Sequence, residues 1–225
     1  MFFAYSDVNR DSFVSNTYLL AVGKLPTFAA GDKKYEKIVA IANLKIDEWA
    51  READWKNLYD PKYPIGTIST SDTYEIDDEV EKLTAAYGDY IIIQKDDREY
   101  RYQTVAPENL KMYDHGEYCA VVGRNLVFNR TFTSDDPVFG GTILAPVKLY
   151  PEKLTSAGST VPVTDPNWLV KITAAEWVRN DNVRQNQYPN LVAEANALME
   201  KMKEANDESQ VSEVTIAMPP VGRSW

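Results

Sequence analysis

The sequence contains one cysteine, Cys119, and one histidine, His115, among 225 residues. A single cysteine cannot form an intrachain disulfide, which argues against a small secreted fold held together by disulfides. Structural zinc needs about four cysteine or histidine ligands, so the His115-x-x-x-Cys119 spacing supplies at most half a site. A nucleophilic cysteine–histidine pair is formally possible, but a turn at His115 followed by a strand at Cys119 favours local structural roles.

Long hydrophobic runs and a surplus of positive charge are also missing. No apolar run approaches the roughly 20 residues that span a bilayer, so we expect no membrane helix. Residues 1–10 lack a basic stretch before an apolar core, so we expect no secretory signal. The formal charge of −10 argues against a general nucleic-acid-binding protein, because phosphate contacts require a surplus of lysine and arginine. It is compatible with a partner that has a basic patch.

Motifs of common enzyme classes are absent. The sequence has no phosphate-binding loop, no Gly-x-Ser-x-Gly elbow and no dinucleotide fingerprint. Clustered acids could in principle act in hydrolysis or bind a divalent ion. However, each cluster lies in a predicted turn, where aspartate is common because its side chain bonds nearby amides. We therefore predict no catalytic residues, no metal site and no cofactor. The clusters are Asp77, Asp78, Glu79 and Glu81; Asp96 and Asp97; and Asp135 and Asp136.

The most strongly patterned stretch runs from Lys33 to Leu58. Its apolar residues recur at three- and four-residue spacing, which predicts a helix of about five turns capped by Asp32. A second apolar row predicts that this helix packs against more than one neighbour. Pro61 and Pro64 mark its far end. The main stripe is Tyr35, Ile38, Ala42, Ile46, Trp49 and Ala53, and the second row is Val39, Ile41, Leu44 and Ala50.

Three further helices are predicted at about 11–22, 165–178 and 189–206. The first begins at an N-cap at Asp11 or Ser12 and ends at Gly23. The second has Asp165 as its N-cap and Pro166 at its first position. Between residues 168 and 178, apolar side chains occupy most of the helix surface, which predicts a helix buried in a bundle.

Between residues 60 and 164 the hydrophobic period changes to two, which predicts strands. Turn residues at 95–98 and 123–125 predict two hairpins. Residues 107–113 are expected to form one or two helical turns, and Pro146 predicts an edge strand or a bulge. The expected strands are 67–70, 73–76, 90–94, 99–105, 118–122, 126–132 and 142–150.

The expected fold class is α+β: a helical bundle of about four helices with an inserted antiparallel β-rich region and an extended C-terminal arm. The expected parts are N-terminal helices at 1–59, the β-rich insert at 60–164, C-terminal helices at 165–206 and the arm at 207–225. The arm is suited to strand addition or groove docking on another subunit, although a frayed tail is an equal alternative. Its expected partner-binding residues are Val214, Ile216, Pro219, Pro220 and Trp225.

This order of elements resembles the head-to-tail adaptor (connector) proteins of tailed bacteriophages. The resemblance covers roughly residues 11–206 and rests on layout more than on invariant chemistry. It is carried by Ile38, Ile41, Asn43 and Trp49 in the early helix, by Trp55 and Leu58, by the strand from Tyr74 to Ile76, by the helix from Trp168 to Trp177, and by Tyr188, Pro189 and Leu191.

The resemblance implies a non-enzymatic structural protein of the virion. Such a protein would form a ring, expected to hold twelve copies, in the neck at the head–tail junction after assembly in the host cytoplasm. The ring would bind the portal protein and tail or neck proteins, and genomic DNA would pass non-specifically through its lumen. If acidic side chains line that lumen, they would repel phosphate and let DNA slide.

Two alternatives remain open at this stage. The 14 tyrosines and five tryptophans would suit a carbohydrate-binding or other tail-side binding module with an exposed aromatic platform. A carboxylate-dependent hydrolase would instead require two of the clustered acids to meet in one cleft.

Overall fold

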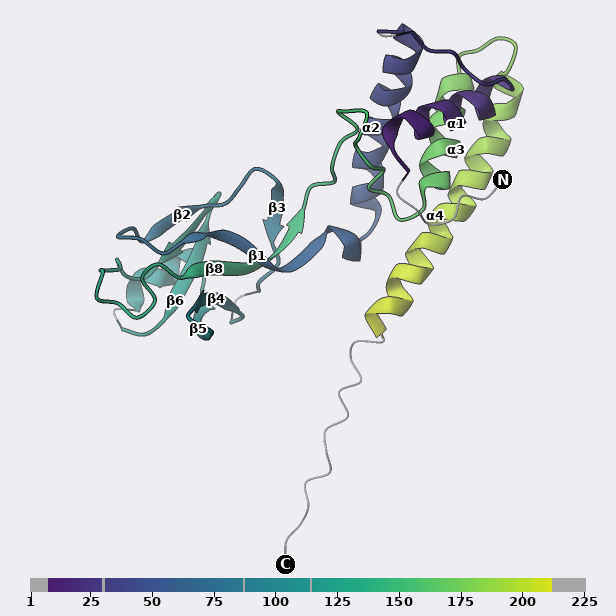
Figure 1. Cartoon of the computed structure of the whole chain (residues 1–225). Helices are drawn as coiled ribbons and strands as arrows, with labels where there is room; N and C mark the ends of the chain where they lie inside the picture. The colour runs from purple at the N-terminus through teal and green to yellow at the C-terminus, as the bar shows by residue number, and fades with distance from the viewer. Residues whose placement is uncertain (1–7, 30, 87, 114, 212–225) are drawn as a thin grey trace, which may run out of the picture. The chain divides into compact units, whose positions relative to one another are not determined.

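The computed structural model describes residues 8–29, 31–86, 88–113 and 115–211, with side chains described as far as Asp207. The chain divides into two compact units, residues 1–56 with 151–225 and residues 57–150. We call the first the helical unit and the second the sheet unit. Figure 1 shows the helices in one unit and the strands in the other.

The helical unit is organised around its third helix. Its α-helices are α1 (Arg10–Val22), α2 (Lys33–Glu52), α3 (Pro166–Val178) and α4 (Tyr188–Val211), with a short 3-10 turn, η3 (Gln185–Gln187), before α4. Helix α3 packs against each of the other three. Its predicted N-cap is confirmed, since the Asp165 side chain accepts a hydrogen bond from the backbone N–H of Asn167. Burial of Leu169, Ala174 and Val178 explains its nearly continuous apolar sequence.

Helix α2 follows its predicted stripe but ends six residues early. Asp32 caps it through the Lys34 amide, and Ile38, Ala42, Ile46 and Trp49 are fully buried. The chain leaves the helix at Ala53, whose backbone is extended, and a 3-10 turn, η1 (Lys56–Leu58), follows. The second apolar row is wrong at Leu44, which is 64% exposed.

The ends of α1 and α4 also differ from expectation. Helix α1 is capped by Asn9, whose side chain accepts from the Ser12 amide, so the cap lies before the expected Asp11 or Ser12. It ends as predicted at Gly23, which has the left-handed backbone (φ 78°) that glycine adopts without steric cost. Helix α4 continues to Val211, so residues 207–211 of the expected arm are helical.

The residues expected to make the arm's contacts lie outside the described part of the chain. They are Val214, Ile216, Pro219, Pro220 and Trp225.

The sheet unit contains eight strands in one sheet, in the order β1-β8-β4-β5-β6-β7-β2, with β3 also paired to β8. A 3-10 helix, η2 (Pro107–Met112), connects β5 to β6 at the helical turns that the sequence predicts. The strands are β1 (Tyr59–Thr67), β2 (Thr73–Glu75), β3 (Val80–Leu83), β4 (Tyr90–Lys95), β5 (Arg98–Thr104), β6 (Tyr118–Val122), β7 (Asn125–Phe128) and β8 (Thr142–Leu149).

The expected fold class is therefore wrong. The dominant element is not a helical bundle with an inserted antiparallel region but a mixed, curled sheet with its own core. It is mixed because β5 and β6 pair in parallel, with Gln103 opposite Tyr118. It curls far enough that Tyr74 of β2 lies beside Gly66 of β1 and accepts a hydrogen bond from the Ser69 amide (2.9 Å). Local sequence patterns indicate strands but not which strands pair, so they could not reveal this curled, mixed order.

Strand β1 was hidden by its two prolines, Pro61 and Pro64, which the sequence pattern assigned to a helix end. Between Asp60 and Tyr63, β1 has one more residue than the opposing part of β8, so the strand bulges there. The bulge lies opposite Pro146 of β8. On its other side, β8 pairs with β4 before Pro146 and with β3 after it. The register irregularity thus lies in β1, opposite Pro146, and not in the strand that contains Pro146, and β8 is an interior strand rather than the expected edge.

The two predicted hairpins are present. Asp96 and Asp97 both have positive φ (48° and 59°) and join β4 to β5, as expected for a two-residue turn in which short polar residues adopt the left-handed region. Gly123 (φ 62°) and Arg124 join β6 to β7. The β6–β7 turn places Arg124 at one end of the curled sheet.

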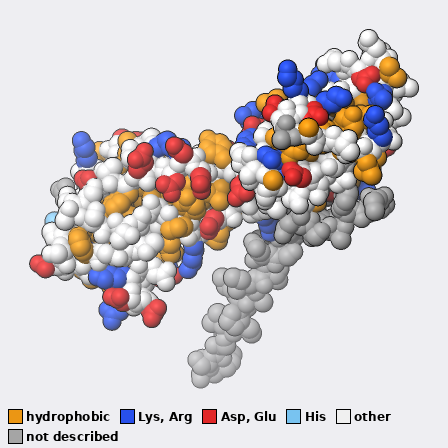
Figure 2. All heavy atoms as spheres, turned by 45° about the horizontal axis from the view of Figure 1, so that its top comes forward, with side chains coloured by type: hydrophobic (Ala, Val, Ile, Leu, Met, Phe, Trp, Pro, Cys, Tyr) orange, Lys and Arg blue, Asp and Glu red, His pale blue; other side chains and the backbone are white. Residues whose placement is uncertain are grey.

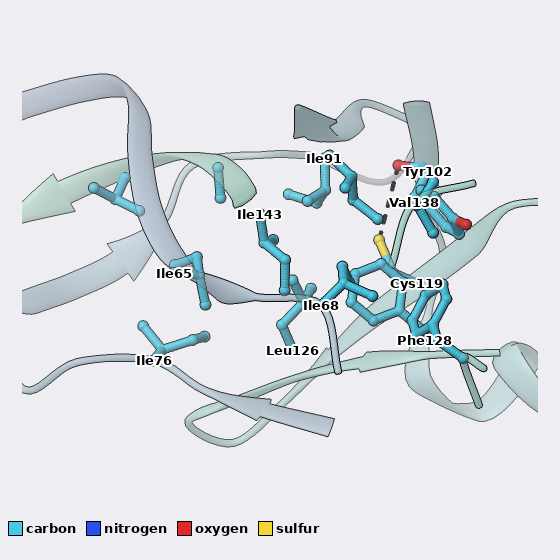
Figure 3. Close-up of a cluster of buried hydrophobic side chains, with 14 of the residues drawn as sticks. Ile65, Ile68, Ile76, Ile91, Tyr102, Cys119, Leu126, Phe128, Val138 and Ile143 are labelled. Atoms are coloured by element: carbon cyan, nitrogen blue, oxygen red, sulfur yellow. Dashed lines mark hydrogen bonds between the residues drawn. The ribbon is translucent and has the colours of Figure 1, made fainter. Parts of the chain in front are cut away.

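The core of the sheet unit is a cluster of aliphatic and aromatic side chains (Figure 3). Tyr102, Phe128 and Phe132 contact one another edge to face, with the Tyr102 and Phe128 centroids 5.0 Å apart. Figure 3 places Ile76 at the opposite side of the cluster from Tyr102 and Phe128. The core therefore extends to the segment between β2 and β3.

Candidate assembly surface

A groove of about 520 Å³ opens on the sheet unit next to β3. Its floor contains Ile76, Val80 and the Thr104 side chain, all of which are buried. The half-buried walls include Leu83 and Val121, which pack against the core cluster. The groove is thus an open continuation of the hydrophobic core, and its volume falls within the roughly 300–1,000 Å³ typical of binding pockets.

One side of β3 is left without a partner strand. In the part of the chain that the structure describes, β3 pairs only with β8, where Val80 lies opposite Leu149 and Leu83 opposite Val147. All four residues of β3 line the groove. On this side the Val80 amide already donates to the Asp77 carbonyl (3.0 Å) and the Val80 carbonyl lies 3.4 Å from Arg124 Nη1. An added chain would therefore bond to the edge at its Leu83 end.

Arg124 fixes the segment that leads into β3. Its guanidinium Nη2 donates to the carbonyls of Ile76 (3.1 Å) and Asp77, and its Nη1 lies 3.4 Å from the Val80 carbonyl. Its Nε lies 3.4 Å from a carboxylate oxygen of Asp78. A single side chain from the β6–β7 turn therefore holds the loop between β2 and β3 and shapes one end of the groove.

Thr104 shapes the other end. Its hydroxyl contacts the carbonyls of Asp89 (3.0 Å) and Ala86, and its own carbonyl accepts from the Gly88 amide (2.8 Å). The loop between β3 and β4 is thereby held beside the end of β5. The groove is framed on both ends by bonds that do not depend on a bound partner.

Large apolar side chains also reach the surface elsewhere in both units. Figure 2 shows apolar side chains exposed among charged ones on the face that it draws. The most exposed are Val183 (79%), Met112 (77%) and Leu25 (73%). Isolated exposed apolar residues are common, so none of these defines a surface by itself. Among these surfaces in the described part of the chain, the groove is the one that combines an apolar lining with a strand edge that has no partner strand.

The acidic clusters are engaged in local structure. Asp136 accepts hydrogen bonds from the Thr133 amide (2.7 Å) and from Arg130 Nη1 (2.8 Å). The Thr133 amide, with Arg130 beside it, holds the pKa of Asp136 below its ordinary value of 3.8. A lowered pKa keeps this carboxylate charged, which suits a turn-stabilising role and not that of a general acid.

The first cluster behaves similarly. Asp77 accepts a hydrogen bond from the Tyr63 hydroxyl (3.0 Å), and Glu81 lies 3.5 Å from Lys148 Nζ. Burial, followed by the bond to Asp77, raises the pKa of Tyr63. With Asp96 and Asp97 in a hairpin turn, these contacts support the structural interpretation of the acidic residues.

His115 and Cys119 lie in different environments. His115 is exposed, whereas Cys119 is fully buried with its Sγ 3.8 Å from the Tyr102 carbonyl (Figure 3). Burial raises the pKa of the Cys119 thiol to about 12, which leaves it almost entirely protonated near neutral pH. Among the described residues, no group of three or more histidine, cysteine, aspartate or glutamate side chains could hold a metal ion.

Asn129, the first residue of an Asn-Arg-Thr glycosylation sequon, has a structural role that its sequence does not indicate. Its side-chain Nδ2 donates to the carbonyls of Tyr113 (2.8 Å) and Gly116 (3.2 Å), and its Oδ1 accepts from the Tyr118 amide (3.3 Å). It therefore fixes the connection between η2 and β6. A glycan on Nδ2 would disrupt these bonds.

The helical unit offers a second hollow of about 540 Å³, but its character is polar. There the Tyr35 hydroxyl bonds the Asp11 carboxylate, and the Arg10 guanidinium lies 5.3 Å from the centre of the Tyr35 ring. Burial, followed by the bond to Asp11, raises the pKa of Tyr35. Tyr35 and Asp11 satisfy each other, although Arg10 Nε has no hydrogen-bond partner among the described residues. The polar lining makes the hollow a weaker candidate for partner binding than the apolar groove.

Sequence patterns missed the groove because they missed β3. Residues 77–81 carry four acids, which predicts a turn, and β3 has only four residues. The available signal was the pair Val80 and Leu83, whose apolar side chains flank Glu81 and Lys82. Four residues are too few to separate a strand from a turn by periodicity.

No protein-family model matches the chain, and a search of curated proteins found no significant match. None of the described helices is both long and apolar enough to cross a membrane.

Proposed function

We propose that this protein is a non-catalytic assembly subunit, specifically a head-to-tail adaptor that forms a ring between a phage portal and a tail. The observation that carries the proposal is the open edge of β3 beside an apolar groove. A surface of this kind gains backbone hydrogen bonds and apolar burial when another chain occupies it. A ring built from head-to-tail contacts needs such a site on every copy.

The state of the polar residues supports a role without catalysis. Several acids of the three clusters are turn residues or ion-pair partners, as Asp136 and Glu81 illustrate. The buried thiol of Cys119 has a raised pKa, which is unfavourable for a nucleophile. These acidic side chains and the buried thiol are thus accounted for by the fold.

The partners follow from the proposed position in the virion. The ring would contact the portal protein on one side and tail or neck proteins on the other, with twelve copies as the expected number. A formal charge of −10 on each copy would keep DNA from adhering as it passes through the lumen. A lumen lined mainly by lysine and arginine would contradict this part of the proposal.

Electron microscopy of the purified full-length protein, alone and mixed with its portal, tests the proposal. We expect rings with an axial channel that attach to the portal. The matched variants are Leu83→Glu, in the groove, and Leu44→Glu, on the exposed face of α2. Leu83→Glu should reduce ring formation at least tenfold, whereas Leu44→Glu should leave it unchanged. A wild-type protein that stays monomeric at high concentration and in the presence of portals would refute the proposal.

One observation bears on the alternative of a carbohydrate-binding module. Tyr113 and Tyr118 stack on each other with centroids 4.2 Å apart, and Tyr113 is 36% exposed. Sugars stack on open aromatic faces, so this pair offers one outer face and not a row of coplanar rings. Tight binding on a glycan array that is lost in Tyr113→Ala would favour the alternative, and rings with no glycan binding would favour the adaptor.

A further inference from the structure

The open edge of β3 and the apolar groove beside it together form a site that an additional β-strand can occupy. We propose that residues 212–218 of a neighbouring copy add to this edge as an extra β-strand and place Val214, Ile216 and Met218 in the groove. The inference rests on the proposed ring, because the ring supplies the neighbouring copy.

The edge that β3 shares with β8 is fully used. Beyond the paired residues, the Tyr150 amide donates to the Glu79 carbonyl (2.8 Å) and the Thr84 amide donates to the Pro146 carbonyl (2.9 Å). Backbone groups alternate between the two edges of a strand, so those of Val80 and Leu83 face away from β8. The Val80 amide and carbonyl are bonded to Asp77 and Arg124, so the added strand would pair with β3 at Leu83. Within the described residues, no strand pairs with that side.

The groove offers apolar contacts next to this edge. Val80 is buried in its floor, and Leu83 and Val121 form half-buried walls that pack on the core. In strand addition, the backbone bonds provide affinity while pockets take every second side chain of the added strand. The site therefore calls for a segment with apolar residues at alternate positions.

Residues 213–218 have this pattern. Val214, Ile216 and Met218 alternate with Glu213, Thr215 and Ala217, and β-branched residues occupy three consecutive positions. Pro219 and Pro220 follow, and proline cannot donate to a strand ladder. The strand-forming part of the segment is thus limited to the length that a four-residue edge such as β3 can pair.

The proposal also fixes where the donor helix must lie. Helix α4 ends at Val211, three residues before Val214. Because an extended chain spans at most about 3.6 Å per residue, the end of the donor α4 must lie within about 11 Å of the first paired position of the acceptor. The last turn of α4 of one copy is therefore expected at the groove of the next.

Cysteine pairs in full-length chains test the inference. One chain carries Leu83→Cys, and the other carries a cysteine at one position from 213 to 218. The two are mixed, assembled and oxidised. We expect one of positions 214, 216 and 218, the one that lies opposite residue 83, to form at least five-fold more covalent dimers than either of its sequence neighbours. Adjacent side chains point to opposite faces of a strand, and a disulfide needs Cβ atoms about 4 Å apart. The buried Cys119 should contribute no background.

Hydrogen exchange on the wild-type protein gives a second measurement that requires no substitution. The Leu83 amide, which faces away from β8, should exchange at least ten-fold more slowly in assembled rings than in dissociated subunits. Deletion of residues 212–225 should abolish this difference. Cross-linking without alternation, no cross-linking, or unchanged exchange would overturn the inference.

The remaining outcomes separate this inference from the proposed function. Rings that form without the alternating pattern would refute the strand addition but leave the adaptor proposal standing. In a double variant with Leu83→Cys and Ile216→Cys, a disulfide confined to monomers would show that the segment occupies its own groove and would refute a neighbouring donor. Absence of rings under all conditions would refute the proposed function itself.

Discussion

The Arg124 guanidinium donates a hydrogen bond to the Ile76 carbonyl at 3.1 Å, and this bond joins the β6–β7 turn to the segment before β3. The same side chain reaches the carbonyls of Asp77 and Val80. Three carbonyls from one loop thus converge on one planar group. The edge on which the assembly proposal depends is held in place by this residue.

Arg124→Ala should loosen β3 without unfolding the sheet. We expect a loss of about 1–2 kcal/mol, because hydrogen bonds from a charged donor are stronger than neutral ones but this side chain is partly exposed to water. Hydrogen exchange should be faster at residues 76–83, and urea denaturation should give the change in free energy of unfolding.

Arg124→Lys is the matched control for charge. Lysine keeps the positive charge near Asp78 but presents a compact ammonium that cannot reach three carbonyls in one plane. It should therefore recover less than half of the lost stability. Full recovery by lysine would show that charge, and not the shape of the guanidinium, holds the loop.

In the helical unit, the rings of Trp49 and Trp55 stack with centroids 4.9 Å apart, and Trp55 Nε1 donates to the Trp49 carbonyl (2.6 Å). Trp55→Phe keeps an aromatic ring but removes the donor, so we expect a loss of about 1–2 kcal/mol. Trp55→Ala removes both and leaves a cavity, so we expect a loss of about 3–5 kcal/mol. Equal losses in urea denaturation would show that the hydrogen bond accounts for the whole effect.

Gly141 precedes β8 at a position with no room for a side chain. A Cβ there would lie 2.8 Å from Ile93 Cγ2 and 2.9 Å from the Val138 carbonyl oxygen. Gly141→Ala should therefore destabilise the sheet unit by about 1–3 kcal/mol, as overpacking does. Gly158→Ala is the control, since a Cβ at Gly158 meets nothing within 4 Å. A thermal midpoint for Gly141→Ala equal to that of the control would contradict the prediction.

Asp136 makes an acid-dependent contribution to stability. Its pKa in the folded protein is lowered from the ordinary value of 3.8, chiefly by the Thr133 amide. A group with a lowered pKa stabilises the fold above its unfolded pKa and loses that effect as the pH falls through the folded pKa. Asp136→Asn should therefore be less stable than wild type at pH 7, and the difference should shrink below about pH 4.

Urea denaturation of both proteins from pH 7 to pH 2 measures this difference. Asp135→Asn, which removes the adjacent exposed carboxylate, is the control, and its difference from wild type should be smaller at pH 7. A constant gap between wild type and Asp136→Asn across the whole range would show that the Asp136 charge has no role in stability.

Local sequence patterns were reliable where the structure depends on neighbours along the chain. The caps at Asp32 and Asp165, the buried stripe from Ile38 to Trp49 and the left-handed end at Gly23 each follow from residues within one or two turns. The Asp96–Asp97 turn is equally local. In all of these, backbone preference and side-chain hydrogen bonding act over a few residues.

The same patterns failed where contacts join distant residues. The fold class was wrong because the parallel pairing of β5 with β6 and the curl that brings Tyr74 to Gly66 depend on pairing across the unit. Strand β1 was missed because its prolines lie at two register shifts, Pro61 between Asp60 and Tyr63 and Pro64 next to Gly66. The acidic residues before β3 predicted a turn, and the strand is recognised only by its pairing with β8.

The sequence alone determined the approximate positions of the four α-helices, the caps at Asp32 and Asp165, the tight turns and the overall acidity, because each of these depends on residue type and short-range spacing. Only the tertiary structure decided the order of the strands, the open edge of β3 and the groove beside it. That groove exists because Arg124, in the β6–β7 turn, and Thr104, at the end of β5, hold two loops against one curled sheet. Periodicity carries no information about such long-range pairing.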